Sequence, residues 1–299
     1  MNNVYIRSKN SLQSIIIKTI LSLIPLILFG VYYNGYLVKR YVGGGVVTIF
    51  KPITYILVGI VIGALVNIIF TKKTKNTKVS DLLFSSFHIL YGIIIGSLMS
   101  YSVNIIVYAL VISVLFILSK LVDIKINVIA LAFIIIYIIT NINGEFDYNY
   151  FGEVIKHVSE GNVKDLLIGF SRGGLCATSL ILILISNVYL QVTSSIKTNI
   201  FIYSFASFFI LVLVSDLIGV EGLYTYIASV PFVFLYVATE SMSSCYTLKG
   251  TAIYGLLIGI TTFILYLFNP LLAPFIAVLV ASFFHVLIDK LASKQRSKK

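Results

Sequence analysis

Charged residues are scarce in this sequence. Lys, Arg, Asp and Glu together make up 11% of the chain, whereas hydrophobic residues make up 59%. An average soluble domain carries roughly 25% charged residues. Because a water-soluble fold cannot cover its surface with so few charges, the composition excludes a soluble globular protein.

The sequence also lacks the common motifs of catalytic and metal sites. The three histidines, at positions 88, 157 and 285, lie far apart and show no HExxH spacing. No GxSxG elbow is present, and the glycines at 43–45 are not followed by the Gly-Lys-Ser/Thr of a P-loop. The two cysteines, Cys176 and Cys245, do not form a CxxC pair. We therefore expect neither a catalytic side chain nor a metal site of these kinds.

Long apolar runs dominate what is present. They come in blocks of about 17–20 residues, the length needed to cross a bilayer core of about 30 Å. Such blocks form helices or closed barrels in lipid, and barrel strands alternate apolar and polar residues. The run from Ile126 to Ile142 does not alternate. The sequence thus predicts an all-α membrane protein of about ten transmembrane helices, at residues 16–36, 52–70, 82–99, 102–119, 126–142, 173–192, 199–217, 222–239, 251–268 and 271–288.

The placement of charge predicts the orientation of these helices. If the N-terminus is cytoplasmic, the inner segments hold 16 of the 22 Lys and Arg residues, as the positive-inside rule requires. The long outer loop at 143–172 holds five of the eleven acidic residues. Both termini are therefore expected in the cytoplasm. Cys176 and Cys245 then lie near opposite faces, which argues against a disulfide. Tryptophan is absent, so tyrosines such as Tyr32 and Tyr33 are expected at the membrane interface.

The helices are expected to form one polytopic domain, residues 1–299. The 143–172 loop joins two halves, 1–142 and 173–299, with five helices each. An odd number of spans per half predicts an inverted repeat, an architecture of many transport proteins. Small residues at four-residue spacing, in Gly59/Gly63, Gly92/Gly96 and Gly255/Gly259, indicate close helix packing.

Two polar stretches interrupt the apolar sequence. The first, residues 171–179, has glycines followed by Thr178 and Ser179 at a helix start. Free backbone N–H groups there form a potential cradle for an anion or ligand. A glycine turn with a Thr or Ser cap is the alternative interpretation.

The second stretch, residues 238–250, contains an acid at a helix end and many hydroxyl groups. It is either a segment folded back into the bundle or an ordinary solvated loop. Ionisable residues at membrane depth are functional candidates because burial is costly, and Glu240 is the best one. We expect both stretches to dip toward the midplane and form one cofactor cavity. Its expected residues are Gly173, Gly174, Thr178, Ser179, Thr239, Glu240, Ser243, Ser244, Thr247 and Lys249.

These stretches resemble the RnfD/NqrB family, whose members are the flavin-bearing membrane subunits of Rnf electron-transport complexes and of the Na⁺-pumping NADH:quinone oxidoreductase. The family carries a GSxGETS-like segment before a helix and, further along, an ATDPxTSPxTxKG-like segment. The first segment is matched here by Gly173, Leu175, Thr178 and Ser179. The second is matched by Ala238, Thr239, Ser244, Thr247, Lys249 and Gly250, with Glu240 in place of Asp. The similarity continues through 253–259 to the final Leu-Ile-Asp at 287–289.

The chain departs from the family in its outer loop. Family members usually carry SGAT there, and its Thr receives FMN through a phosphoester bond. Between Gly144 and Phe170 this chain has no Thr, and Ser159 sits in Val-Ser-Glu-Gly instead. Ala177 and Cys176 replace the family's Glu and Gly. The chain resembles a shortened, diverged member without the flavinylation motif, so any flavin (FMN or riboflavin) is expected to be noncovalent.

The resemblance implies a membrane electron-transfer subunit. It would move electrons between a cytoplasmic donor and a flavin, quinone or extracellular acceptor, and coupling to ion transport is compatible with it. Expected partners are other membrane subunits of an oxidoreductase complex, the lipid bilayer and a quinone, but not nucleic acid. The expected location is a bacterial plasma membrane. Two other functions remain open from the sequence: a transporter or channel for a small solute or ion, and a ligand-free scaffold subunit.

Overall fold

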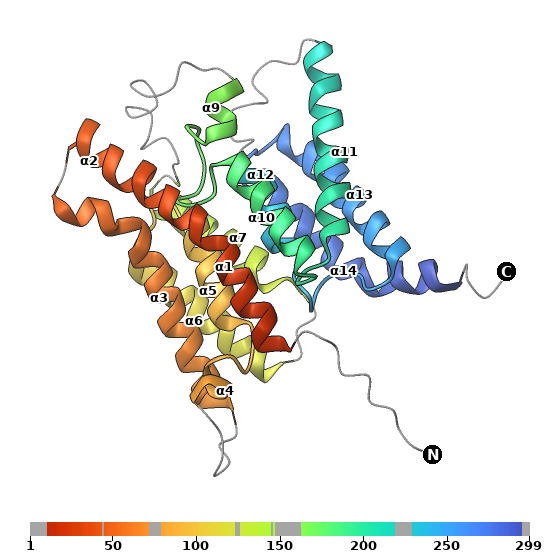
Figure 1. Ribbon diagram of the computed structural model, residues 1–299, viewed down its shortest axis with the longest axis horizontal. Helices are drawn as coiled ribbons and strands as arrows, with labels where there is room; N and C mark the ends of the chain where they lie inside the picture. Colours follow the sequence, from red (N-terminus) through yellow and green to blue (C-terminus); the bar gives the residue numbers. More distant parts are fainter. Residues whose placement is uncertain are drawn as a thin grey trace.

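A computed structural model of the chain describes residues 11–43, 45–71, 79–122, 126–144, 146, 163–218 and 229–294. Throughout these residues the regular structure is helical (Figure 1). Five helices are long and apolar enough to cross a membrane: Leu12–Tyr41, Val46–Phe70, Thr198–Leu217, Leu248–Tyr266 and Ala273–Ser293. Four shorter apolar helices accompany them. The predicted all-helical, multi-pass membrane fold is confirmed.

The first half begins with one long span made of three parts and continues with five further helices. Their bounds are α1 Leu12–Gly30, η1 Val31–Leu37, α2 Val38–Tyr41, α3 Val46–Phe70, α4 Val79–Leu83, α5 His88–Leu98, α6 Ile105–Leu121 and α7 Val128–Asn143. Capping side chains fix several starts: Ser11 caps α1, Asn104 caps α6 and Asn127 caps α7.

The second half is also helical in the residues that the structure describes. Its bounds are α9 Val163–Ile168, α10 Leu180–Val192, α11 Thr198–Leu217, α12 Ser229–Phe232, η3 Val233–Val237, α13 Leu248–Tyr266 and α14 Ala273–Lys294. In each half the third span is short and buried. Every residue of α5 is buried, and so is every residue from Val230 to Val237. Two short helices therefore lie inside the bundle, and longer ones surround them.

The outer helices present apolar side chains to the surroundings. Ile69 is 71% exposed, Leu110 62% and Leu213 57%. Soluble monomers rarely expose such surfaces over many helices, whereas a lipid-facing surface requires them.

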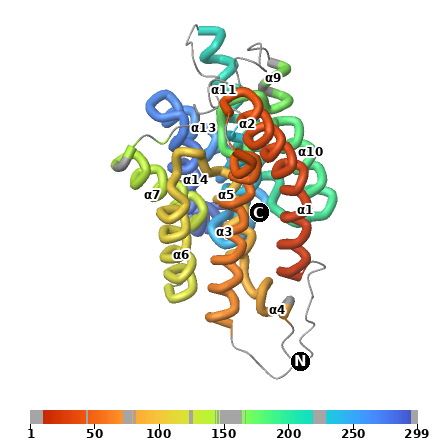
Figure 2. The backbone as a smooth tube through the Cα atoms, turned by 90° about the vertical axis from the view of Figure 1, so that its left-hand side faces the viewer, coloured from red at the N-terminus to blue at the C-terminus, as the bar shows by residue number. Residues whose placement is uncertain are grey.

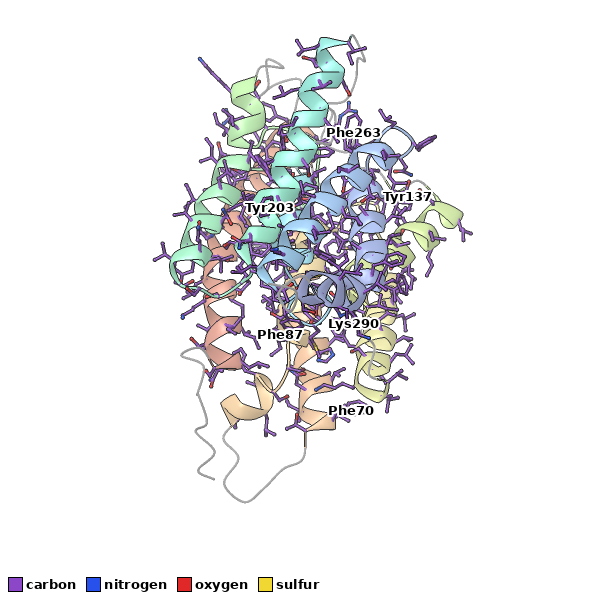
Figure 3. The ribbon with its side chains drawn as sticks, turned by 90° about the vertical axis from the view of Figure 1, so that its right-hand side faces the viewer. Phe70, Phe87, Tyr137, Tyr203, Phe263 and Lys290 are labelled. Carbon is purple, nitrogen blue, oxygen red and sulfur yellow. The ribbon has the colours of Figure 1, made fainter. Side chains whose placement is uncertain are left out.

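The two ends of the bundle are visible in the figures. The last residues of α3 and the short α4 lie at the lower end, and α9 lies at the upper end with the last residues of α11 (Figures 1 and 2). Figure 3 shows Phe87 between Phe70, at the lower end, and Phe263, in the upper part. In the predicted topology the lower end is the cytoplasmic side.

Two of the predicted helices are corrected. The predicted helix 82–99 is broken at 84–87, between α4 and α5, where the Asn67 side chain bonds the carbonyls of Leu83 (2.7 Å) and Ser86 (3.3 Å). The predicted helix 173–192 begins only at Leu180. Residues 174–177 bond to another helix and to each other instead, so Gly173 and Gly174 precede the helix and do not open it.

The glycine pairs are packing positions. On α3 and α5, Gly59 and Gly92 face each other so closely that a Cβ on either would overlap the backbone carbonyl of the other. On α13, a Cβ at Gly255 would lie 2.8 Å from the Ile200 carbonyl of α11. The absence of side chains thus lets these backbones approach, as the four-residue spacing predicted.

Candidate functional site

The first polar stretch runs along the C-terminal end of the buried helix α5. The Leu175 N–H donates to the Met99 carbonyl at 3.0 Å, and the Cys176 N–H donates to the Ser97 carbonyl at 2.8 Å. A Cβ at Gly174 would lie 2.8 Å from the Leu98 Cα. This close approach explains the glycine. The stretch satisfies the carbonyls that α5 leaves without partners at its end.

The opposite side of this stretch contacts the first span. The Asn34 side-chain amide donates to the Leu175 carbonyl, and a Cβ at Gly30 would lie 2.5 Å from the Cys176 Sγ. The π-helical segment η1 begins directly after Gly30. Single π turns inside α-helices occur frequently at functional sites. The first stretch is therefore folded into the bundle between α5 and η1.

Individual residues of the first stretch have different roles. Ser179 caps α10, because its Oγ accepts from the Leu182 N–H at 3.5 Å, so the cap interpretation is confirmed for this residue. The Gly174 N–H donates to Ser229 Oγ at 3.2 Å, and Gly173 packs against the same serine. Within the described residues, the buried Thr178 Oγ1 has no hydrogen-bond partner.

The second stretch centres on Glu240, which is only 8% exposed. One carboxylate oxygen accepts from the Tyr91 hydroxyl of α5, and the other accepts from Ser243 Oγ. The backbone N–H groups of Met242 and Ser243 also point to it. Four donors thus converge on one carboxylate, which offsets much of the cost of burying its charge.

Asn127 joins this cluster to α7. Its Oδ1 accepts from the Ala130 N–H at 2.9 Å as the helix cap. Its Nδ2 donates to the Val237 carbonyl at 2.7 Å and to Ser243 Oγ at 3.1 Å. We call Tyr91, Asn127, Glu240 and Ser243 the Glu240 site.

Sequence reasoning identified Glu240 and Ser243 but missed Tyr91 and Asn127. The signal for Asn127 was present: a single Asn directly precedes an apolar helix, as expected of a buried cap. Tyr91 gave no comparable signal, since it lies within an apolar run.

The other predicted residues of the second stretch hold the backbone. Thr239 Oγ1 donates to the Leu235 carbonyl one turn earlier. Ser244 accepts from Lys197, and Thr247 caps α13 by accepting from the Gly250 N–H at 3.0 Å. Lys249 is exposed in the first turn of α13.

Two cavities flank the Glu240 site. The larger, about 100 Å³, is lined by Ser86, His88 and Lys120, and the smaller, about 30 Å³, by Tyr236 and Thr239. Phe87, Tyr91 and Glu240 line both cavities. These three side chains therefore separate the two spaces.

His88 is a hydrogen-bonded member of the bundle. Its Nε2 lies 2.8 Å from Ser119 Oγ, and its Nδ1 lies 3.1 Å from Asn67 Oδ1. Ser86 Oγ also contacts Nδ1. This network links α3, α5 and α6 across the break at 84–87 and borders the larger cavity.

The two polar stretches contact opposite parts of α5. The first bonds to Ser97 and Met99, whereas the second bonds to Tyr91. At about 1.5 Å per residue, Tyr91 and Ser97 are separated by roughly 9 Å along the helix. Residues 173–179 of the first stretch are buried, as are residues 238–240 and 243–245 of the second, and the described cavities adjoin only the second stretch.

The side chains of the site determine whether it suits a metal ion or a flavin. Among the described residues, no three His, Cys, Asp or Glu side chains are grouped so that they could hold a metal ion. For a flavin the residues fit in kind, since Phe87, Tyr91 and Tyr236 offer aromatic faces and the Glu240 site offers polar groups. The volume does not fit, because ligand pockets commonly measure about 300–1,000 Å³. A ring system would therefore require these side chains to move.

Comparison with known proteins agrees with the sequence motifs. No curated protein matches the chain significantly. The family model described as NQR2, RnfD, RnfE matches residues 1–298. This match covers all ten predicted helices, both polar stretches and the Leu-Ile-Asp of α14. The chain therefore belongs to the NQR2, RnfD, RnfE family.

Proposed function

We propose that this protein is a membrane-embedded electron-transfer subunit that carries electrons between a cytoplasmic donor and a flavin, quinone or extracellular acceptor. Family membership indicates a membrane subunit of an Rnf- or Nqr-type complex. The observation that carries the finer proposal is Glu240, a carboxylate buried among aromatic side chains between two cavities. In the proposed orientation it faces the cytoplasm of a bacterial cell, where a donor protein would deliver electrons.

The proposed cofactor is a noncovalent flavin at the Glu240 site. A flavin would supply the redox chemistry itself. Once the surrounding side chains have moved to admit the ring, Phe87 and Tyr91 would contact it, and Glu240 and Ser243 would bind its polar groups. The residues of the first stretch, Gly173 to Ser179, would support this site by fixing the other end of α5.

The test of this proposal is a spectrum of the protein purified from its own membranes in mild detergent. Absorbance bands of an oxidised flavin are expected, and mass analysis should identify FMN or riboflavin after release. Glu240→Gln should lower the flavin content, whereas Asp216→Asn, at an exposed acid near the end of α11, should not. A colourless protein from intact complex would contradict the cofactor proposal.

A second function is favoured by the size of the larger cavity. About 100 Å³ accommodates roughly three water molecules, at about 30 Å³ each. A buried carboxylate beside such a space suits a proton or small cation, and intramembrane acids commonly line ion pathways. Flux of a cation into proteoliposomes without any electron donor would favour this transporter over the electron-transfer subunit. The absence of both flux and flavin would leave the scaffold subunit.

A further inference from the structure

The loop between η3 and α13, residues 241–247, borders both cavities. Ser241 lines the smaller cavity and Met242 lines the larger one. Residues 243–245 are buried, whereas Met242 and Tyr246 are 55% and 68% exposed. The loop therefore separates the Glu240 site from the surroundings at this end of the bundle.

A cation holds one side of this loop. Lys197 directly precedes α11, and its Nζ donates to the Ser244 carbonyl at 3.2 Å and to Ser244 Oγ at 3.0 Å. The same Nζ lies 3.7 Å from the centre of the Tyr246 ring. Charge-assisted hydrogen bonds and a cation–π contact both depend on the ammonium form. The preceding residue, Ile196, lines the smaller cavity, so the anchor of the loop directly follows a residue of the cavity wall.

An anion from a different helix holds the other side. Asp289 of α14 accepts from the Tyr246 N–H at 2.8 Å, from the Thr247 N–H at 3.0 Å and from Thr247 Oγ1 at 2.7 Å. A Cβ at Gly250 would overlap this carboxylate. The final Leu-Ile-Asp motif thus has a physical role, because its Asp fixes the start of α13.

We propose that Lys197 and Asp289 form a clamp that holds the 241–247 loop closed over the Glu240 cavities, and that neutralising Lys197 opens the loop. Opening would displace Ser241 and Met242, which line the two cavities. It would enlarge cavities that are too small for a ring-sized ligand when the loop is closed. The clamp concerns access to the site, whichever ligand or ion the site takes.

Burial of Lys197 makes the clamp sensitive to alkaline pH. Burial lowers the pKa of Lys197 to about 8, although Asp289 of α14 and Cys245 and Glu240 of the second stretch all favour its charged form. Lys18 of α1 donates to the Thr193 carbonyl, in the segment between α10 and α11 that ends at Lys197. Lys197 is therefore charged at pH 7 and loses its proton as the pH rises through about 8. The clamp is closed below this pH and released above it.

Cys245 provides a reporter inside the loop. Its side chain is fully buried, and its Sγ donates to the His285 carbonyl at 3.4 Å. Burial raises the pKa of the Cys245 thiol to about 12, so the closed loop offers almost no reactive thiolate. In a Cys176→Ser background, the rate of modification by a maleimide measures how often the loop opens.

The first experiment compares this rate at pH 7 in native membranes. Lys197→Gln and Asp289→Asn should each accelerate labelling by about tenfold or more, the expected effect of losing a charge-assisted hydrogen bond. Lys197→Arg keeps the charge and should label nearly as slowly as wild type. Lys290→Gln removes an exposed charge next to Asp289 and serves as the matched control. Wild-type labelling of Lys197→Gln would overturn the clamp.

The second experiment needs only proteins with a basic residue at 197, so it does not depend on the folding of the neutral variant. Labelling of wild type and of Lys197→Arg is compared from about pH 7 to about pH 9.5, since Arg stays charged throughout. The ratio of the wild-type labelling rate to the Lys197→Arg rate corrects for thiolate formation, because both proteins contain the same thiol. This ratio should rise about tenfold around pH 8. A constant ratio would show that neutralising Lys197 does not open the loop. Neither experiment requires a redox group, so the clamp and the electron-transfer proposal can fail separately.

Discussion

At the scale of single residues, Glu240 connects three parts of the chain that are distant in sequence. Its carboxylate accepts from Tyr91 of α5 and from Ser243, and Ser243 accepts from Asn127 at the start of α7. No Lys or Arg is among these direct partners of the carboxylate. Its charge is balanced by hydroxyl and backbone donors, an arrangement that leaves it available to a ligand or ion.

Replacing Glu240 with Gln should therefore impair function more than folding. The amide has nearly the same shape, but its NH₂ group would oppose one of the donors. Electron transfer should fall roughly tenfold or more, because a ligand held by the carboxylate would lose a charge-assisted hydrogen bond worth about 1.5–3 kcal/mol. Donor-dependent reduction in membrane vesicles measures this rate. Asp216→Asn is the control, and an unchanged rate in Glu240→Gln would remove Glu240 from the site.

A second prediction at this scale concerns covalent flavin. Between Gly144 and Phe170 the chain has no Thr that could form a phosphoester with FMN. Most of these residues lie outside the described part of the structure. After denaturing electrophoresis the protein should show no flavin fluorescence, even when a flavin transferase is coexpressed. A fluorescent band that disappears in Ser159→Ala would identify Ser159 as an acceptor.

At the scale of elements, the short helices α5 and α12–η3 distinguish this fold from a simple bundle of spans. Every residue of α5 and every residue from Val230 to Val237 is buried, and each of these helices is followed by a polar, nonhelical segment. In lipid, irregular backbone is tolerated only where protein covers it or water reaches it. Here protein covers it: the Leu175 N–H bonds the Met99 carbonyl directly after α5, and Lys197 and Asp289 hold the 241–247 loop after η3.

The contact between α3 and α5 should depend on Gly92. A methyl group there would overlap the Gly59 backbone, which cannot move aside like a flexible side chain. Gly92→Ala should therefore cost at least about 1–3 kcal/mol and lower the melting temperature. Gly45→Ala is the matched control, because no atom lies within 4 Å of its Cβ position and its φ of −78° suits alanine. Size-exclusion chromatography after heating measures the melting temperature of each variant. Equal melting temperatures of Gly92→Ala and Gly45→Ala would contradict this contact.

At the scale of the whole molecule, the two halves present the same order of elements. In the described part of each half a short buried helix follows two apolar helices and precedes two more, although the first apolar helix is long in the first half and short, Leu180–Val192, in the second. The Glu240 site takes Tyr91 and Asn127 from the first half and Glu240 and Ser243 from the second. The site therefore exists only when the halves are packed together.

The orientation of the whole molecule can be tested by labelling single cysteines. With both native cysteines replaced, a cysteine at Asn149 should react with an impermeant reagent added outside the cell, and one at Asn76 should not. The physical reason is the 16-to-6 division of basic residues between the inner and outer segments. Both positions lie outside the described residues. The reverse labelling pattern would invert the topology and place the Glu240 site on the outer side.

The sequence by itself determined that this is a membrane protein, because its scarcity of charge leaves lipid as the only suitable environment. It also determined the number of spans, because each apolar run is long enough to cross a bilayer. It also identified Glu240 and the two polar stretches, since polar groups in apolar runs need partners. The hydropathy of the sequence does not predict the break at 84–87 or the start of α10 at Leu180. It also does not predict the roles of Tyr91, Asn127 and Lys197. Each of these depends on a hydrogen bond to a residue distant in the chain, as when the Leu175 and Cys176 N–H groups bond to the end of α5. Only the packing of the two halves brings such donors and acceptors together.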